Sequence, residues 1–156
     1  MSLGPYLMMK YLPREEQPKY VTAWVFAFLS WHHMNSFLYN FGGYAMDIST
    51  YSMLLTAKLH ALAWCYRDGG VKDQEKNLYE SQVKWQVKEM PGLLEYWSYV
   101  FYGNACALGV FFEFSDYKRF IEKTGEYKNS PSPILPTLEY VMYGLICLGF
   151  HLLGAH

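Results

Sequence analysis

The sequence predicts an all-α fold in which several apolar helices cross a membrane. Only 17% of the 156 residues are charged, against about 25% in an average soluble protein, while 19% are aromatic. The charges are also unevenly distributed, since none occurs between Lys19 and Asp47. The mean hydropathy of −0.06 hides this pattern, because the 15 tyrosines count as polar although tyrosine is common at membrane interfaces. The distribution of charge therefore indicates a multi-pass helical membrane protein.

Four apolar stretches are long enough to form three to four membrane helices joined by amphipathic connectors. A helix needs about 20 predominantly apolar residues to cross the hydrocarbon core of a bilayer. One such stretch is equally typical of a buried helix in a soluble protein, but four leave too little polar sequence to cover them all. A soluble α-helical domain is therefore disfavoured, and residues 1–156 are interpreted as a single membrane-embedded segment. The stretches occupy residues 20–41, 48–66, 91–112 and 136–156.

Glycine and proline positions favour helices over strands in these stretches. Gly69 and Gly70 follow the second stretch, where a left-handed C-terminal cap is expected. Pro91 and Pro136 fall near the starts of the last two stretches, where the missing N–H of proline is harmless. Within the third stretch, Gly103 and Gly109 indicate close helix packing or a local break, and we favour packing.

A short amphipathic helix is predicted in the connector after the third stretch. Ser115 and Asp116 are suitable N-terminal caps, and Gly125 is placed to end the helix. The helix is apolar on one side and basic on the other, so it fits either the bilayer surface or an ordinary connector. Its apolar residues are Tyr117, Phe120 and Ile121, and its basic residues are Lys118, Arg119 and Lys123.

The basic residues weakly specify an orientation. If all four stretches cross the membrane, the connectors 10–19 and 67–89 share one side and 113–128 lies on the other. The first side carries eight lysines and arginines and the second carries four, which favours a cytoplasmic location for the first. A third stretch that enters and leaves by the same face would invalidate this count.

Several classes of protein are excluded by composition. A formal charge of −1 provides no basic field for nucleic acid. Cys65, Cys106 and Cys147 are widely spaced in apolar stretches, which argues against disulfides or a zinc site and favours small buried side chains. The first ten residues lack the basic region of a signal peptide, and no lipidation motif is present. No metal or bound cofactor is expected.

Few polar side chains within the stretches are candidates for chemistry. His32 and His33 are adjacent, so they point about 100° apart on a helix and cannot converge on one metal; helix–helix hydrogen bonding or an interfacial position is favoured over catalysis. Lys58 must reach the interface, find a partner or face a water-filled cavity. His60 and Asp68 share roughly one helix face, where a proton relay is conceivable. Glu95 is interpreted as a charge at headgroup level. No nucleophile elbow, P-loop or dinucleotide-binding motif is present.

The order of short motifs between Asp47 and Tyr127 resembles the membrane-bound O-acyltransferase family, in its lysophospholipid acyltransferase branch. In that branch an acidic entry leads into an apolar helix with a lysine that ends in Asp-Gly. A Pro-x-Leu-Leu-Glu-Tyr element and an aromatic Phe-x-x-x-x-Tyr-x-x-Phe pattern follow. The matching residues here are Asp47-Ile48, Met53-Leu54-Leu55, Lys58-Leu59, Asp68-Gly69, then Pro91, Leu93, Leu94, Glu95 and Tyr96, then Phe112, Tyr117 and Phe120.

This resemblance implies an enzyme of the endoplasmic reticulum membrane that transfers a fatty acyl group from acyl-CoA to a lysophospholipid. A histidine acts as general base in such enzymes, with a partner asparagine upstream of it. His151 and His156 lack the family's His-Gly context, and His32 and His33 precede the Asp47 element. The catalytic pair is therefore expected beyond His156, and the chain alone is expected to be an inactive part of a larger domain. The alternative is a small non-enzymatic integral membrane protein that binds lipid or a partner chain.

Overall fold

The computed structural model describes residues 1–39, 41, 48–71, 78–103, 109–129 and 131–154, and every regular element in these ranges is a helix. This confirms the predicted all-α class. The chain divides into two compact units, Met1–Glu122 and Lys123–His156, and each is described by itself. The predicted positions Asp47, Cys106 and His156 lie outside the described residues.

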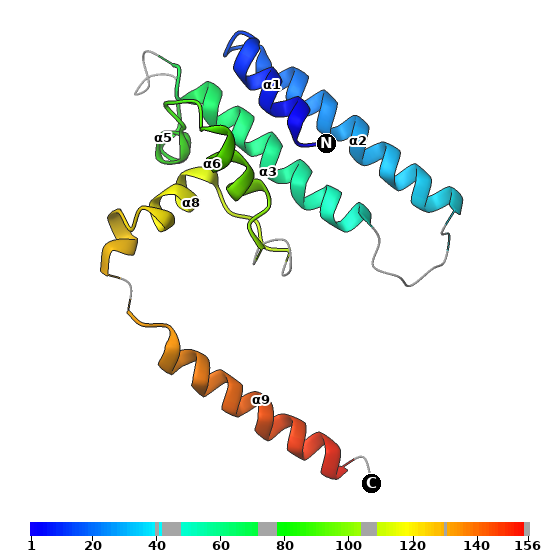
Figure 1. The fold of residues 1–156 in the computed structure, drawn as a ribbon, viewed down its shortest axis with the longest axis vertical. Helices are drawn as coiled ribbons and strands as arrows, with labels where there is room; N and C mark the ends of the chain where they lie inside the picture. The colour runs from blue at the N-terminus through cyan, green and yellow to red at the C-terminus, as the bar shows by residue number, and fades with distance from the viewer. Residues whose placement is uncertain (40, 42–47, 72–77, 104–108, 130, 155–156) are drawn as a thin grey trace. The chain divides into compact units, whose positions relative to one another are not determined.

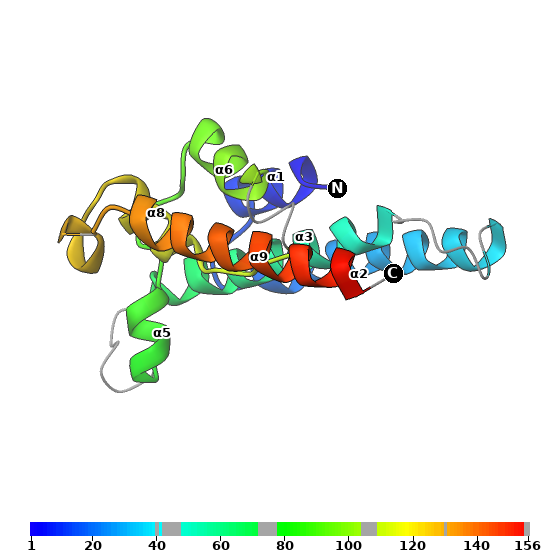
Figure 2. The same ribbon diagram turned by 90° about the horizontal axis from the view of Figure 1, so that it is seen from below.

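Two long antiparallel helices form the frame of the first unit. Helix α2 (Gln17–Tyr39) and helix α3 (Ile48–Asp68) lie side by side in both views (Figures 1 and 2). The Gln17 side chain donates a 2.8 Å hydrogen bond to the Ala63 carbonyl, which joins the start of α2 to the last turns of α3. The short helix α1 (Leu3–Tyr11) packs on the same pair. The fully buried apolar contacts between α2 and α3 come from Val21, Val25, Leu59, Leu62 and Ala63.

The third apolar stretch does not form one long helix. Helix α6 covers only Leu93–Val100, eight residues or about 12 Å, which is far less than the roughly 30 Å core of a bilayer. Tyr96, Tyr99 and Val100 of α6 are fully buried. The Tyr96 hydroxyl donates a 2.6 Å hydrogen bond to the Ser2 carbonyl, which ties α6 to the amino terminus of the chain. Aromatic residues suit a protein core as well as a membrane, so hydropathy alone did not reveal that this stretch does not cross as one helix. We refer to the stretch 91–112 as the fold-back.

The connectors before and after the third stretch meet at one end of the α2–α3 pair. Helix α5 (Glu80–Trp85) precedes the stretch and helix α8 (Phe114–Ile121) follows it. The Ser115 hydroxyl of α8 donates a 2.7 Å hydrogen bond to the Trp85 carbonyl. The start of connector 113–128 therefore lies beside the end of connector 67–89, which is the arrangement expected if the third stretch enters and leaves by the same face. Connectors 10–19 and 67–89 contact each other, since the Arg14 guanidinium donates hydrogen bonds to the carbonyls of Val87 and Lys88.

Helix ends in the first unit depart from the predicted caps. Helix α3 ends at Asp68 as expected, but neither Gly69 nor Gly70 has a positive φ. Gly69 is instead required by close approach, since a Cβ there would lie 2.1 Å from the Val87 carbonyl oxygen. The cap residue of α8 is Glu113, and Ser115 is turned to the Trp85 carbonyl.

The predicted glycine roles in the third stretch and in the connector after it also change. No described atom lies within 4 Å of a Cβ placed at Gly103 or Gly109, so the described residues show no close packing at either glycine. Gly109 instead has a φ of 68°, typical of a turn. Gly125 has a φ of 59° and opens the 3-10 helix η1 (Gly125–Asn129).

The second unit contains the helix with the strongest membrane character. Helix α9 runs over Ile134–Gly154, with Pro136 in its first turn as predicted. Within the described residues, Ile134–Leu152 is the one helical segment long and apolar enough to cross a membrane by length and composition. Large apolar side chains such as Leu138, Leu145 and Phe150 are more than half exposed.

Candidate functional site

Lys58 is the centre of the region that carries the resemblance. Its side chain is completely buried in the middle of α3. The ammonium donates a 3.0 Å hydrogen bond to the Tyr99 carbonyl near the end of α6. It also lies 5.0 Å from the centroid of the Tyr99 ring and 4.6 Å from that of Phe112. A cation at the carboxyl end of a helix is stabilised by the free carbonyls there and by the faces of aromatic rings.

Aromatic rings surround this lysine and connect helix α6, the end of the fold-back and helix α8. The Tyr99 and Phe112 centroids are 5.8 Å apart, and the Tyr99 hydroxyl donates a 2.9 Å hydrogen bond to the Phe112 carbonyl. Tyr117 of α8 lies 5.7 Å from Tyr99 and 6.2 Å from Phe112. Such contacts add stabilisation beyond apolar burial. Lys58, Phe112 and Tyr117 are three of the predicted motif positions, and the fold brings them together.

Arg14 clamps the end of α3 to the segment after α5. Its guanidinium donates 2.6 Å hydrogen bonds to the carbonyls of Tyr66 and Val87 and a 2.9 Å hydrogen bond to that of Lys88. The guanidinium also stacks on the Tyr66 ring at 4.0 Å. One side chain therefore satisfies carbonyls that the end of a helix leaves without partners.

Asp68 closes the same end of α3. Its buried carboxylate accepts hydrogen bonds of 2.7 and 3.0 Å from Arg67 and one of 3.1 Å from Gln82. The Arg67 guanidinium lies 4.3 Å from the Trp64 ring. The predicted Asp68-Gly69 element is thus an ion pair followed by the glycine that touches the Val87 carbonyl.

A cavity of about 240 Å³ lies beside α3, between α5 and the start of α8. His60, Cys65, Asp68 and Glu113 all line it, so the fold confirms a shared face for His60 and Asp68. The Cys65 thiol donates to a Glu113 carboxylate oxygen at 3.7 Å. Burial is the largest influence on Glu113 and raises its pKa; the hydrogen bond from the Cys65 thiol lowers the pKa by less, and the negative charge of Asp116 adds a still smaller raise. This cavity can hold water or a small polar group.

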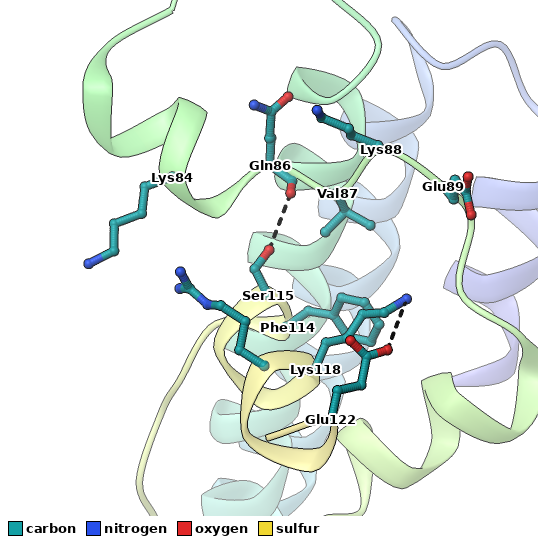
Figure 3. Close-up of a pocket in the computed structure, with 10 residues that line it drawn as sticks. Lys84, Gln86, Val87, Lys88, Glu89, Phe114, Ser115, Lys118 and Glu122 are labelled. Carbon is teal, nitrogen blue, oxygen red and sulfur yellow. Dashed lines mark hydrogen bonds and ion pairs between the residues drawn. The ribbon is translucent and has the colours of Figure 1, made fainter. Parts of the chain in front are cut away.

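A second cavity, of about 390 Å³, opens between residues 84–89 and α8 (Figure 3). Its charged lining comprises the cations Lys84, Lys88, Lys118 and Arg119 and the carboxylates Glu89 and Glu122. Ser115 lies at its wall, where its hydroxyl also contacts the Gln86 carbonyl at 3.3 Å. We refer to this space as the basic cleft.

The histidines predicted from sequence are not brought together in the described structure. His32 is half-buried and His33 exposed on α2, and neither makes a hydrogen bond within the described residues. His60 pairs with the Thr22 hydroxyl, its Nδ1 lying 2.9 Å from that oxygen. His151 is on α9 in the other unit. The part of the chain that the structure describes also contains no group of three or more metal-ligating side chains.

The other predicted polar residues have structural partners. Glu95 lies in the first turn of α6, where its carboxylate is 3.3 Å from the Lys118 ammonium. Cys65 and Cys147 are free thiols, but Cys147 is exposed and not buried as expected.

Sequence reasoning missed Arg14, Glu113 and Tyr99. Arg14 and Glu113 lie in polar connectors, where a charge is unremarkable, and Tyr99 is one of 15 tyrosines. Their roles depend on contacts across 41 to 74 residues of sequence, which no local pattern encodes.

The chain is similar in sequence to several known acyltransferases. The chain is 30% identical over 131 residues to Lysophospholipid acyltransferase 6 of Drosophila melanogaster, a match that covers 74% of this chain and 18% of the fly protein. It is 32% identical over 130 residues to Membrane-bound glycerophospholipid O-acyltransferase 2 of Rattus norvegicus, covering 74% of this chain and 25% of the rat protein. A Lysophospholipid acyltransferase of Saccharomyces cerevisiae is 27% identical over 123 residues, covering 77% and 20% respectively. No family model and no solved structure matches the chain.

These matches agree with one another and with the motifs that meet around Lys58. Over most of its length the chain is similar to members of the membrane-bound O-acyltransferase family. Its relatives within that family are those named as lysophospholipid acyltransferases, and the chain spans about a fifth of their length.

Proposed function

We propose that this chain is the part of a lysophospholipid acyltransferase that builds the scaffold beside the catalytic chamber. The complete enzyme transfers a fatty acyl group from acyl-CoA to a lysophospholipid hydroxyl in the endoplasmic reticulum membrane. The observation that carries the proposal is the similarity to enzymes of that name, at 27–32% identity over more than 60% of this chain. Acyl-CoA is the co-substrate in this proposal, and no bound cofactor takes part.

The scaffold role follows from what the motif residues contact. Lys58, Tyr96 and Tyr117 are buried, and their polar atoms or ring faces meet other parts of this chain. Asp68 is buried in an ion pair, and Glu95 pairs with Lys118. Side chains engaged in this way fix the fold-back against α3 and are poorly placed to react with a substrate.

The general base of the reaction is proposed to come from outside this segment. A base must remove the proton of the lysophospholipid hydroxyl as its oxygen attacks the thioester carbonyl, after which the CoA thiolate leaves. His60 is hydrogen-bonded to Thr22. His32 and His33 lie on α2, apart from the motif residues that surround Lys58. We therefore expect no transfer by the chain alone.

A membrane location is supported by apolar surfaces that nothing in the described structure covers. On α2, Trp31, Phe37 and Leu38 are more than 60% exposed, and on α9 Phe150 is 71% exposed. Exposed apolar side chains in such numbers are typical of surfaces that contact lipid or further protein. We propose that α2, α3 and α9 each cross the bilayer, so that the protein is multi-pass, and that the segment containing α6 enters and leaves by one face.

A chimera tests the proposal directly. The matching stretch of the Drosophila enzyme is replaced by this chain, and microsomes are supplied with labelled oleoyl-CoA and a panel of lysophospholipids. We expect transfer by the chimera and none by this chain expressed alone. A second chimera with Lys58→Ala serves as a matched control and is expected to lose transfer together with its yield of folded protein.

Two outcomes would contradict the proposal. A chimera that inserts and folds like the fly enzyme, yet acylates no lysophospholipid, would favour a non-enzymatic membrane protein that binds lipid or a partner chain. Transfer by this chain alone would place the general base within it.

A further inference from the structure

The basic cleft between residues 84–89 and α8 has the features of an anion site. Its volume of about 390 Å³ falls within the range of small-molecule pockets. Two walls from different parts of the chain form it, and the 2.7 Å bond from the Ser115 hydroxyl to the Trp85 carbonyl holds them together. The cleft therefore depends on the fold-back and not on one flexible segment.

The charges of the cleft do not cancel. Arg119 pairs with Asp116 at 2.7 Å, and Lys118 lies 3.3 Å from Glu95 and 3.9 Å from Glu122. In the described part of the chain, neither Lys84 nor Lys88 has a carboxylate within ion-pair distance. Both lysines are exposed at the rim, and the Lys84 ammonium lies 4.5 Å from the centroid of the Trp85 ring, so an incoming anion meets two ammonium groups that no described carboxylate neutralises.

One buried donor in the cleft also lacks an acceptor. The Nε atom of Arg119 is buried, and no described atom accepts its hydrogen bond. Arginine N–H groups form strong, short bonds with phosphate oxygens, which carry charge and can accept several donors at once. A phosphate group in the cleft would lie beside the Arg119 guanidinium and neutralise the two rim lysines.

The outer face of α8 indicates where such a phosphate is found. Phe120 and Ile121 are 49% and 54% exposed, directly after Lys118 and Arg119 in the chain. A short helix with exposed apolar and basic residues side by side is typical of the membrane interface, where lipid phosphates lie.

We propose that the basic cleft binds a phosphate group, supplied by the headgroup of an anionic phospholipid in the adjacent leaflet. The shared chemistry is the phosphate, and a soluble phosphoester is the other possible source. This inference takes from the proposed function only that the chain lies in a membrane. It is tested by binding and not by acyl transfer, so the two proposals fail separately.

The test uses the full chain in detergent micelles and measures heat on titration. The probes are dioctanoyl phosphatidic acid, dioctanoyl phosphatidylcholine and adenosine 3′,5′-bisphosphate. We expect saturable binding of phosphatidic acid, weakened about tenfold by Lys84→Ala combined with Lys88→Ala. The control, Lys10→Ala with Lys19→Ala, removes the same charge from exposed positions near the same end of α2 and α3 and is expected to change the Kd less than about twofold. Because all four lysines are exposed, both double variants are expected to fold, as equal thermal unfolding midpoints will verify.

Each outcome either assigns the source of the bound phosphate or rejects the proposed phosphate site. Binding of phosphatidic acid that the cleft variant alone weakens, and that falls with added salt, supports the lipid source. Binding of the bisphosphate with the same dependence on Lys84 and Lys88 supports the phosphate site but assigns it to a soluble phosphoester. Equal binding of phosphatidic acid and phosphatidylcholine, or equal weakening by both double variants, overturns the proposal.

Discussion

Helices α3 and α9 are both 21 residues long, yet they are used in opposite ways. Helix α3 contains buried polar and charged residues, Ser52, Thr56, Lys58 and Asp68, and other parts of the chain cover them. Helix α9 carries large apolar side chains that are about half exposed or more throughout, and it alone among the described helices meets the criteria for a membrane span. In a membrane protein the more polar helix therefore belongs inside and the more apolar one outside, the reverse of the arrangement in water.

The sharpest test of this comparison is a pair of identical substitutions. Leu62 in α3 is fully buried, whereas Leu145 in α9 is 57% exposed. We expect Leu62→Ala to lower the free energy of unfolding by about 2–5 kcal/mol because it leaves a cavity, and Leu145→Ala to change it by less than about 0.5 kcal/mol. Far-UV circular dichroism during thermal unfolding in detergent measures both, because it reports the helix content of both units. Equal losses would contradict the different environments of the two helices.

The buried lysine of α3 gives the next largest effect. Lys58→Ala leaves the Tyr99 carbonyl without its ammonium donor and opens a space between two rings, so we expect a loss of about 2–4 kcal/mol. Lys58→Met fills that space without the donor and is expected to cost about 1–2 kcal/mol. Chemical denaturation of both variants separates volume from hydrogen bonding. If neither variant loses stability, Lys58 does not anchor the fold-back.

The end of α3 tolerates no side chain at one position. Gly69→Ala would place a Cβ 2.1 Å from the Val87 carbonyl, so we expect the α3 end and the following segment to separate at a cost of about 1–3 kcal/mol. Gly103→Ala is the matched control, since no described atom lies within 4 Å of a Cβ placed there, and it should change stability by less than about 0.5 kcal/mol. Unfolding midpoints of the two variants provide the comparison. A neutral Gly69→Ala would show that the close approach is not required.

The smallest effect concerns the pH dependence of the cavity beside α3. Because burial raises the pKa of Glu113, the folded protein holds this proton more tightly than the unfolded chain. The resulting contribution to stability is present at acid pH and is lost as pH rises through the folded pKa. Glu113→Gln should therefore match the wild type at about pH 4 and unfold at a higher temperature than it near neutrality. Parallel melting curves across this range would contradict the raised pKa.

The sequence predicted the long helices well because their signal is local. The charge-free stretch between Lys19 and Asp47 places α2 to within a few residues, and the apolar stretch 48–66, whose one charged residue is Lys58, does the same for α3. The fold-back was not predicted, because Tyr96 and Tyr99 fit a lipid interface and a protein core equally well. What distinguishes the two is the Lys58 ammonium, which lies 41 residues from Tyr99 in sequence.

The candidate site follows the same division. The resemblance identified Lys58, Asp68, Phe112 and Tyr117 as important positions. Three of these four, Lys58, Phe112 and Tyr117, lie together around Tyr99. Arg14 and Glu113 escaped notice because their partners are backbone carbonyls and a thiol on other segments. Side chains whose partners are distant backbone atoms leave no pattern in the sequence.

The hydrogen bond from Ser115 to the Trp85 carbonyl has a topological consequence. If the chain lies in a membrane as proposed, a segment that enters and leaves by one face adds no net crossing, so an epitope inserted near Glu122 and one inserted near Glu15 are expected to be accessible from the same compartment. An added protease is then expected to cleave both tags, or neither, in sealed vesicles.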